Sequence, residues 1–328
     1  MKTIYFQHIK IRIILQLLLA LSFTIVSCED ETQTPIDYPN TDRHDLLPSD
    51  IAKQGPETDN HPPILHSTEF EQAIPLAATI NTSGAEDSPF VLPDGKTLYF
   101  FFTPDVRLQP EIQLTDSVSG VWVSRKVNNE WSEAERIWLQ DPDKLALDGA
   151  VSIYGNEMWF ASAREGYTGV NMFTAQLKDE KWEDWTYSGD RLMKEIQIGE
   201  VHIHNDDLYF HSHRDGGQGG LDIWLCIRNE NNWPDPVNIT VMNTSGDEGF
   251  PFLNTNGNEL WFTRTYLGTP AIYRSVKNGN EWENPELIVS QFAGEPTLDD
   301  EGNLYFVHHY FENDVMIEAD IYVAYKKR

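Results

Sequence analysis

The chain has 328 residues, with 24 Lys and Arg against 52 Asp and Glu, which gives a formal net charge of −28. A protein this acidic repels a phosphate backbone, so nucleic-acid binding is excluded. Apolar residues make up 40% of the chain, enough for a large core, whereas two cysteines exclude a disulfide framework and 18 Pro with 21 Gly favour short elements over long helices.

The first 27 residues are predicted to be a signal peptide. Lys2, Lys10 and Arg12 precede an almost wholly apolar run over residues 13–26, which is shorter than the ~20 residues that span a bilayer. The residues before Cys28 resemble a bacterial lipobox, and this resemblance implies cleavage before Cys28 and lipidation of that cysteine. The alternative is an ordinary signal peptide with an incidental cysteine.

Residues 28–63 are predicted to be the lipidated cysteine and a flexible acidic linker, because they are rich in Asp, Glu, Pro, Thr and Asn and show no hydrophobic period. Acidic residues 29–31 resemble the surface-export signal of lipoproteins in one group of Gram-negative bacteria. This resemblance implies an outer-membrane lipoprotein that faces the cell surface and meets the membrane only through its lipid. A periplasm-facing protein is the alternative.

An internal repeat organises residues 64–328. Leu or Met, then Tyr or Trp, then Phe occurs five times after a turn-like stretch, which is typical of a β-hairpin. The five copies begin at Leu98, Met158, Leu208, Leu260 and Leu304. In the first four units a second aromatic residue is followed nine residues later by Trp. These pairs are Trp122 and Trp131, Phe173 and Trp182, Trp224 and Trp233, and Tyr273 and Trp282. Each unit therefore holds four strands, the size of a propeller blade.

The fifth unit lacks its last strand, because Tyr322 has no Trp partner before the sequence stops. Residues 69–74 are similar to residues 281–286, so the segment near Phe70 is predicted to complete the last unit. The sequence thus predicts an all-β, five-bladed β-propeller of four-stranded antiparallel blades, closed by an N-terminal strand.

The repeats resemble the WD40-like propeller repeat of TolB and OmpA-associated proteins. The likeness lies in residues 243–262, 88–96 and 219–224. It implies architecture more than activity, since members of this family bind proteins, peptides or glycans and some related propellers are enzymes.

Each unit has an acidic residue shortly before its first signature, and together these acids are predicted to ring one mouth of the central channel. They are Glu86, Asp148, Glu200, Glu248 and Glu295. Clustered carboxylates attract cations, so the ring predicts a Ca²⁺ site or the acid–base pair of a glycosidase, with Glu86, Asp148 and Glu248 as catalytic candidates and Glu200 and Glu295 as ligand contacts. The alternative is that these acids bind backbone amides and hold the blades closed.

Two histidine pairs alternate on adjoining predicted strands of the third unit. They are His202 with His204, and His211 with His213. Alternate residues of a strand share a face, so four imidazoles there would suit Zn²⁺ or Mn²⁺. His308 and His309 take comparable places in the fifth unit. The alternative is that these histidines pack between blades or form hydrogen bonds along the channel.

Loop arginines and aromatic residues are further candidate ligand contacts. Arg164, Arg214 and Arg264 are placed to bind a carboxylated sugar or a peptide terminus, or else to pair with neighbouring acids. The candidates for stacking on sugar rings are Tyr167, Tyr266, Tyr310 and Phe311, which lie outside the periodic positions.

These features support two functions. The first is a non-catalytic, surface-anchored propeller that binds a glycan, a peptide or a partner protein at the channel mouth, and the lack of a recognisable nucleophile motif favours it. The alternative is an extracellular carbohydrate-active enzyme, a glycoside hydrolase or a metal-dependent polysaccharide lyase, that uses carboxylates or histidines there.

Overall fold

The computed structural model describes residues 38–189, 198–230 and 232–328. The predicted signal peptide, Cys28 and the linker up to residue 37 lie outside the described residues. Strands dominate the described part, which has one four-residue α-helix, α2 (Pro110–Gln113), and one 3₁₀ turn, η1 (Arg43–Leu46). Neither has the length and apolar character needed to cross a bilayer.

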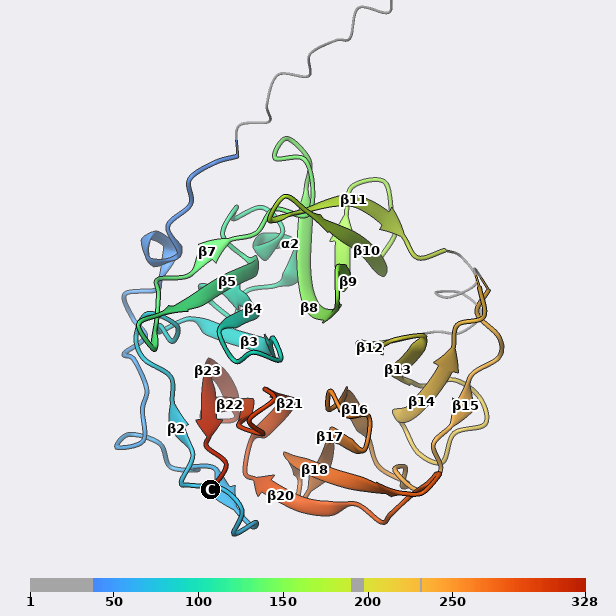
Figure 1. Ribbon diagram of the computed structural model, residues 1–328. Helices are drawn as coiled ribbons and strands as arrows, with labels where there is room; N and C mark the ends of the chain where they lie inside the picture. The colour runs from blue at the N-terminus through green and yellow to red at the C-terminus, as the bar shows by residue number, and fades with distance from the viewer. Residues whose placement is uncertain (1–37, 190–197, 231) are drawn as a thin grey trace, which may run out of the picture. The chain divides into compact units, whose positions relative to one another are not determined.

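The strands pair into antiparallel groups that follow the five sequence units in order and stand in a ring (Figure 1). The first group contains β3 (Ala85–Val91), β4 (Thr97–Thr103), β5 (Gly120–Val127), β6 (Glu130–Trp131) and β7 (Glu135–Arg136). The second contains β8 (Ala146–Tyr154), β9 (Glu157–Arg164), β10 (Val170–Lys178) and β11 (Lys181–Tyr187). The third contains β12 (Val201–His204), β13 (Asp207–Ser212), β14 (Asp222–Ile227) and β15 (Val237–Asn238). The fourth contains β16 (Glu248–Leu253), β17 (Glu259–Tyr266), β18 (Thr269–Asn278), β19 (Glu281–Trp282) and β20 (Glu286–Ser290). The fifth contains β21 (Ala293–Leu298), β22 (Leu304–Glu312) and β23 (Val315–Ala324). The fold is an all-β propeller, as predicted.

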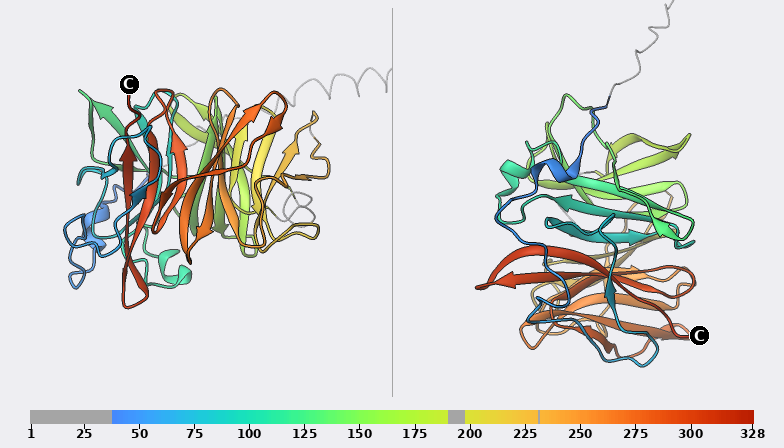
Figure 2. Two further views of the ribbon diagram at one scale, coloured as in Figure 1. Left: turned by 90° about the horizontal axis from the view of Figure 1, so that it is seen from below. Right: turned by 90° about the vertical axis from the view of Figure 1, so that its left-hand side faces the viewer.

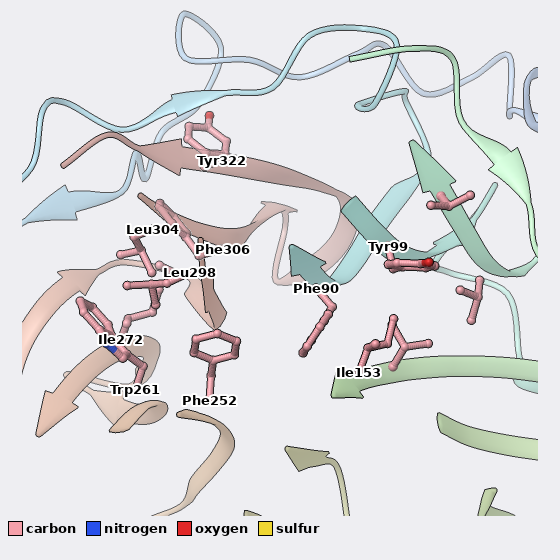
Figure 3. Packing of buried hydrophobic residues seen from close by; sticks show 14 of the residues in the cluster. Phe90, Tyr99, Ile153, Phe252, Trp261, Ile272, Leu298, Leu304, Phe306 and Tyr322 are labelled. Carbon is pink, nitrogen blue, oxygen red and sulfur yellow. The ribbon is translucent and has the colours of Figure 1, made fainter. Parts of the chain in front are cut away.

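The first strand of each group lies nearest the ring axis in Figure 1, and the side views of Figure 2 show strands running roughly along that axis. The sequence signature lies on the second strand of each group, and its Phe is fully buried in every group. Neighbouring sheets pack through such residues: Figure 3 shows Trp261 and Ile272 of the fourth group beside Leu298 and Leu304 of the fifth. The repeat signature is therefore the apolar contact between blades, and apolar burial of this kind is the main favourable term in folding.

The N-terminal segment closes the ring, which confirms the predicted closing strand. β2 (Ile74–Pro75) pairs antiparallel with β23, and Phe70 forms a further bridge with Lys326. β1 (Ile64–Leu65) pairs with β20 of the fourth group. The outer edges of the last two sheets are thereby covered, which protects them from pairing with another chain.

Glu69 links this closing segment to both neighbouring groups. Its carboxylate accepts hydrogen bonds from Arg274 on β18, with 2.6 Å between Nη2 and Oε1, and from Lys326 near the end of the chain. The hydrogen bonds from Arg274 and Lys326 lower the pKa of Glu69 to about 2, although partial burial acts in the opposite direction.

Replacing Glu69 by Gln is expected to destabilise the ring at neutral pH and to matter less in acid. A carboxyl whose pKa is lowered by folding stabilises the protein above its unfolded pKa of about 4.3 and loses that contribution as the pH falls toward 2. Because 41% of the Glu69 side chain is exposed, screening keeps the difference below about 1 kcal/mol at pH 7. Urea unfolding of both proteins between pH 7 and pH 3 measures it, and a difference that stays constant over this range would contradict the assignment.

Residues 38–63, here called the N-terminal arm, pack against the propeller where the sequence predicted a flexible linker. Arg43 is only 2% exposed and donates to the carbonyl oxygens of Thr79 and Ile80 and to Glu86, with 3.3 Å between Nη1 and Oε1. The compact unit therefore begins at Tyr38 rather than at residue 64. Composition did not reveal this, because the arm is held by charged side chains and not by an apolar pattern.

The arm supplies cations to acids buried where the first and fifth groups meet. Lys53 pairs with Glu318 and Asp320 of β23, and Asp320 Oδ2 lies 2.6 Å from the Lys53 ammonium. His308 Nε2 and Asp59 Oδ2 lie 2.9 Å apart in a further buried contact. Buried carboxylates are costly without a cation, so the arm is part of the stabilised fold.

Replacing Arg43 by Met is expected to cost about 3 kcal/mol in the free energy of unfolding, because it leaves Glu86 buried without its cation. Adding Glu86→Gln to Arg43→Met should recover part of this loss, since the uncompensated carboxylate is then gone. Arg125→Met is the matched control, because that side chain is half exposed and pairs only with the exposed Glu135. Denaturant unfolding of the natural protein and these three variants measures the losses, and an Arg43→Met loss no larger than that of the control would contradict the role of the arm.

Candidate functional site

The innermost strands carry a β-bulge where they reach the channel. Four non-glycine residues there have positive φ, and the strand register shifts beside each of them. They are Ser88 on β3, Ala150 on β8, Phe250 on β16 and Glu295 on β21. Glu200 takes the corresponding place just before β12. A bulge bends its strand and re-aims a side chain, so one residue from each group is brought toward the axis.

These bulges enclose a cavity of ≈ 40 Å³ on the axis, which has room for a few water molecules or part of a ligand. Three rings from different groups lie at its inner end: His202 is 4.6 Å from Phe252 and 6.1 Å from Phe90, between ring centroids. Figure 3 shows Phe90 and Phe252 approaching one another from facing innermost strands. The rings close the channel at this depth, so we expect a ligand to enter from the side of the bulges.

Asp87, Glu295 and His309 gather at the mouth of this cavity. One ligand atom from each lies within 4.8 Å of the other two. His309 Nε2 is 3.8 Å from Asp87 Oδ1, and the amide of Ser88 donates to the same oxygen at 3.0 Å. The side chains keep some access to solvent, with 26% of Asp87 and 14% of His309 exposed.

The two carboxyl groups of the cluster and that of nearby Glu200 have pKa values that shift in different directions. Burial and repulsion from Asp87 raise the pKa of Glu200 to about 8. Burial, followed by repulsion from Asp87 and Glu200, raises the pKa of Glu295 well above its ordinary value. Burial opposes ionisation of Asp87 as well, but hydrogen bonding to His309 and the charge of its imidazole lower the pKa of Asp87. Burial therefore opposes ionisation of both glutamates, whereas His309 favours the ionised form of Asp87.

The predicted ring of five equivalent acids is not formed, because two of them lie elsewhere in the repeat. Glu86 accepts from the amide and hydroxyl of Thr82 at 2.9 and 2.7 Å, and Glu248 accepts from Thr244 in the same way at 2.8 and 2.6 Å. Asp148 accepts from Ser162 and from Arg164. These three acids hold their own blades together and do not line the cavity.

Glu200 and Glu295 lie two residues further along the repeat than the other acids, which is why they reach the cavity. The signal in the sequence is the following proline: Glu295-Pro296 corresponds to Ser88-Pro89 and Phe250-Pro251, and not to Glu86. The sequence analysis also missed Asp87, which stands where the other units have glycine. Those glycines are Gly149, Gly199, Gly249 and Gly294.

The four predicted metal-binding histidines do not share a site. His202 belongs to the aromatic contact in the channel, and burial, with a smaller effect of His204, lowers its pKa to about 3. His211 is buried between two innermost strands with its ring nitrogens near the amides of Glu200 and Phe250, and burial lowers its pKa to about 4. His204 and His213 are at the solvent-exposed ends of their strands. Alternation put His202 and His204 on one face, but the strands opposite them carry no metal ligand at the right place.

The predicted arginine and tyrosine ligand contacts do not come together at one site either. Arg164 and Arg264 pair with the acids of their own units, at 2.7 Å from Asp148 and 3.1 Å from Glu248. Arg214 lies over the ring of Trp224. Tyr310 is 3% exposed and its hydroxyl bonds to Tyr322, so it is not free to stack on a sugar. Tyr167 is half exposed but lies in the loop between β9 and β10 and lines neither the cavity nor the groove described below. Tyr266 packs against His66.

Phe311 is the one stacking candidate that opens onto a surface groove next to the cluster. Its ring packs 4.6 Å from that of Phe292, and the Phe292 ring lies 5.5 Å from His61 of the N-terminal arm. The amide of His309 donates to the carbonyl of Phe292 at 3.0 Å, which joins the groove to the cluster. The other lining residues are Asn60, Gly268, Glu312, Asn313 and Asp314.

No protein-family model matches the chain, and a comparison with curated proteins gave no match. Among solved structures, TolB from Acinetobacter baumannii matches 75% of this chain over 55% of its own, at 13% identity and a TM-score of 0.41. An endo-arabinase from Bacteroides thetaiotaomicron matches 77% of this chain over 98% of its own, at 15% identity and a TM-score of 0.46. An α-L-arabinofuranosidase from Podospora anserina matches 79% over 98%, at 9% identity and a TM-score of 0.48. The chain spans about half the length of the TolB chain, and similarity at this level carries no statement about activity.

Proposed function

We propose that the protein binds a neutral saccharide at the mouth of the central channel. The observation that carries the proposal is the composition of the cavity wall, which offers the carboxyl groups of Glu200 and Glu295 and has no Lys or Arg among its described residues. The rest of the wall is largely apolar, so a few hydrogen-bonding groups stand among Pro, Phe and Val side chains. Such a wall favours a ligand that combines hydroxyl groups with apolar C–H faces. An anionic ligand would be repelled by Asp87 and by the net charge of −28.

The neighbouring groove supports the same ligand class. It combines the rings of Phe292, Phe311 and His61 with amide and carboxylate oxygens from Asn60 and Asp314. Aromatic faces pack against the apolar C–H faces of sugar rings, and the polar rim meets their hydroxyl groups. A saccharide longer than one ring can thus bind with its end in the cavity and the next rings in the groove.

A peptide or a partner protein is the competing ligand, since the repeat resembles that of TolB-type propellers. Two features of the repeat support that relation: Asn81 bridges the backbone of Ile321 and Asn243 bridges that of Ile223, each joining its blade to the preceding one. The small cavity and narrow groove nevertheless suit a chain of small rings better than a flat protein surface.

A carbohydrate-active enzyme is the second candidate function. Glu200 and Glu295 line the cavity, and Asp87 lies beside Glu295, so carboxyl groups from three different strand groups are near one another. Hydrolysis of a glycosidic bond needs two such groups on opposite sides of the bond. The catalytic pair would therefore come from these acids and not from Glu86, Asp148 or Glu248, whose oxygens are already engaged.

A glycan array followed by calorimetry with neutral oligosaccharides tests the binding proposal. Phe311→Ala should weaken binding roughly tenfold, about 1.4 kcal/mol, because the groove loses an exposed aromatic ring. Val237→Ala is the control, since Val237 is an exposed apolar residue of the third group and lies outside the groove. Equal affinities of the two variants would argue against the groove. New reducing ends released by the natural protein and not by Glu200→Gln would establish the enzyme instead.

We also propose that the protein is a lipoprotein of the outer membrane, displayed on the cell surface through Cys28. The apolar run over residues 13–26, the residues before Cys28 and the acidic residues 29–31 support this proposal. The acidic propeller would then stand outside the membrane, where extracellular glycans are available.

Replacing Cys28 by Ser should move the protein from the membrane fraction to the soluble fraction of its host, because the lipid is the only proposed membrane contact. Fractionation and surface proteolysis of intact cells measure the two parts of the proposal. Cys226→Ser is the matched control, since Cys226 is a buried residue of the third group. Membrane association that survives Cys28→Ser would refute the anchor.

A further inference from the structure

Asp87, Glu295 and His309 are the one group of three or more His, Cys, Asp or Glu side chains in the described part of the chain whose ligand atoms come together. They come from β3, β21 and β22, so the first and last strand groups meet at this point. The sequence analysis placed a metal among the histidines of the third unit, and none of those residues belongs to this group.

Charge compensation distinguishes five other buried acids from this cluster. Glu86, Asp148 and Glu248 each form an ion pair with an arginine, and Glu318 and Asp320 share Lys53. By contrast, Asp87, Glu200 and Glu295 have no Lys or Arg partner among residues 38–189, 198–230 and 232–328, and the nearest basic group is His309 at 3.8 Å from Asp87. The site is therefore short of positive charge, unlike the five buried acids that pair with Arg43, Arg164, Arg264 or Lys53.

Glu295 gives a second and independent indication of a missing partner. Its Oε2 atom is buried and has no hydrogen-bond partner. The residue is held with φ at 55°, and its amide donates to Thr263 Oγ1 at 2.9 Å. The positive φ is shared with the other bulges, but the unpartnered oxygen is particular to Glu295. A buried acceptor without a donor costs about 1–3 kcal/mol, and a bound ligand would remove this cost.

We propose that Asp87, Glu295 and His309 bind one divalent cation of the Zn²⁺ or Mn²⁺ class at the channel mouth. One imidazole nitrogen and two carboxylate oxygens suit these ions, whereas Ca²⁺ prefers oxygen ligands alone. Ligands of one zinc ion lie roughly 3.4 Å apart, so small side-chain rotations are enough to bring three atoms within 4.8 Å onto one ion. Water or Glu200 would complete the coordination. This proposal does not depend on the identity of the saccharide.

Calorimetry and elemental analysis of the full chain after treatment with a chelator test the proposal. We expect one equivalent of Zn²⁺ or Mn²⁺ to bind with a dissociation constant in the micromolar range or below, and Ca²⁺ to bind at least tenfold more weakly. Glu295→Gln and His309→Ala should each weaken binding of Zn²⁺ tenfold or more. Glu165→Gln, an exposed acid on the β9–β10 hairpin, should leave it unchanged.

Thermal melting distinguishes variants that have lost the ion site from variants that fold poorly. Because a ligand that binds only the native state raises its melting temperature, Zn²⁺ should raise that of the natural protein and of Glu165→Gln, and not that of Glu295→Gln or His309→Ala. No bound ion in a folded natural protein would overturn the proposal. So would an equal shift in all four proteins, which would mean that the ion binds elsewhere.

Discussion

The first and fifth strand groups meet along one seam, and the charges buried there govern how the ring closes. β23 and β3 touch at Ala319 and Ala85, next to Glu86, Glu318 and Asp320. Burial raises the pKa of Asp320 well above its ordinary value, even though Lys53 acts in the opposite direction. Acids at such a seam would push the two groups apart unless cations were brought in. Arg43 and Lys53 supply them from the N-terminal arm, so closure depends on ion pairing as well as on the strands β1 and β2.

The partners of each buried acid also show whether it holds the blade together or could contact a ligand. The segment Asn-Thr-Ser-Gly occurs before Glu86 and before Glu248, and in both places Thr holds the acid through its amide and hydroxyl. Glu200 and Glu295 have no such threonine: Glu295 stands at a bulge, and Glu200 takes the corresponding place just before β12. Where the repeat pattern is complete, its acid stabilises the blade. Where the pattern is broken, the carboxyl group has no such partner within its blade.

Much of the fold follows from local sequence, whereas the site depends on register and on distant contacts. Hairpin turns and buried signatures predict strands, and the likeness between residues 69–74 and 281–286 was enough to predict the closing segment. Counting back from the signature failed for the acids because hairpins differ in length: Phe90 precedes Leu98 by eight residues, but His202 precedes Leu208 by six. Alternation along a strand gave the face of His202 but not its neighbours Phe90 and Phe252, which come from other groups. The role of the arm was equally hidden, because Arg43 and Glu86 are far apart in the chain.

Positive φ recurs at the bulges of the candidate site, as it does in many turns elsewhere in the chain. Positive φ at Ser88, Ala150, Phe250 and Glu295 is unfavourable for residues with a side chain, and a proline or valine follows each of them. Each bulge narrows the channel, and the rings of Phe90, His202 and Phe252 close it further in, so a ligand meets the bulge residues first. Of the five residues at this place in the repeat, three are Ser, Ala or Phe, which cannot ionise. The polarity of the mouth is therefore set by Glu200 and Glu295, together with Asp87 in a position that the other units give to glycine. A few departures from an otherwise regular repeat are enough to give a symmetric scaffold one chemically distinct side.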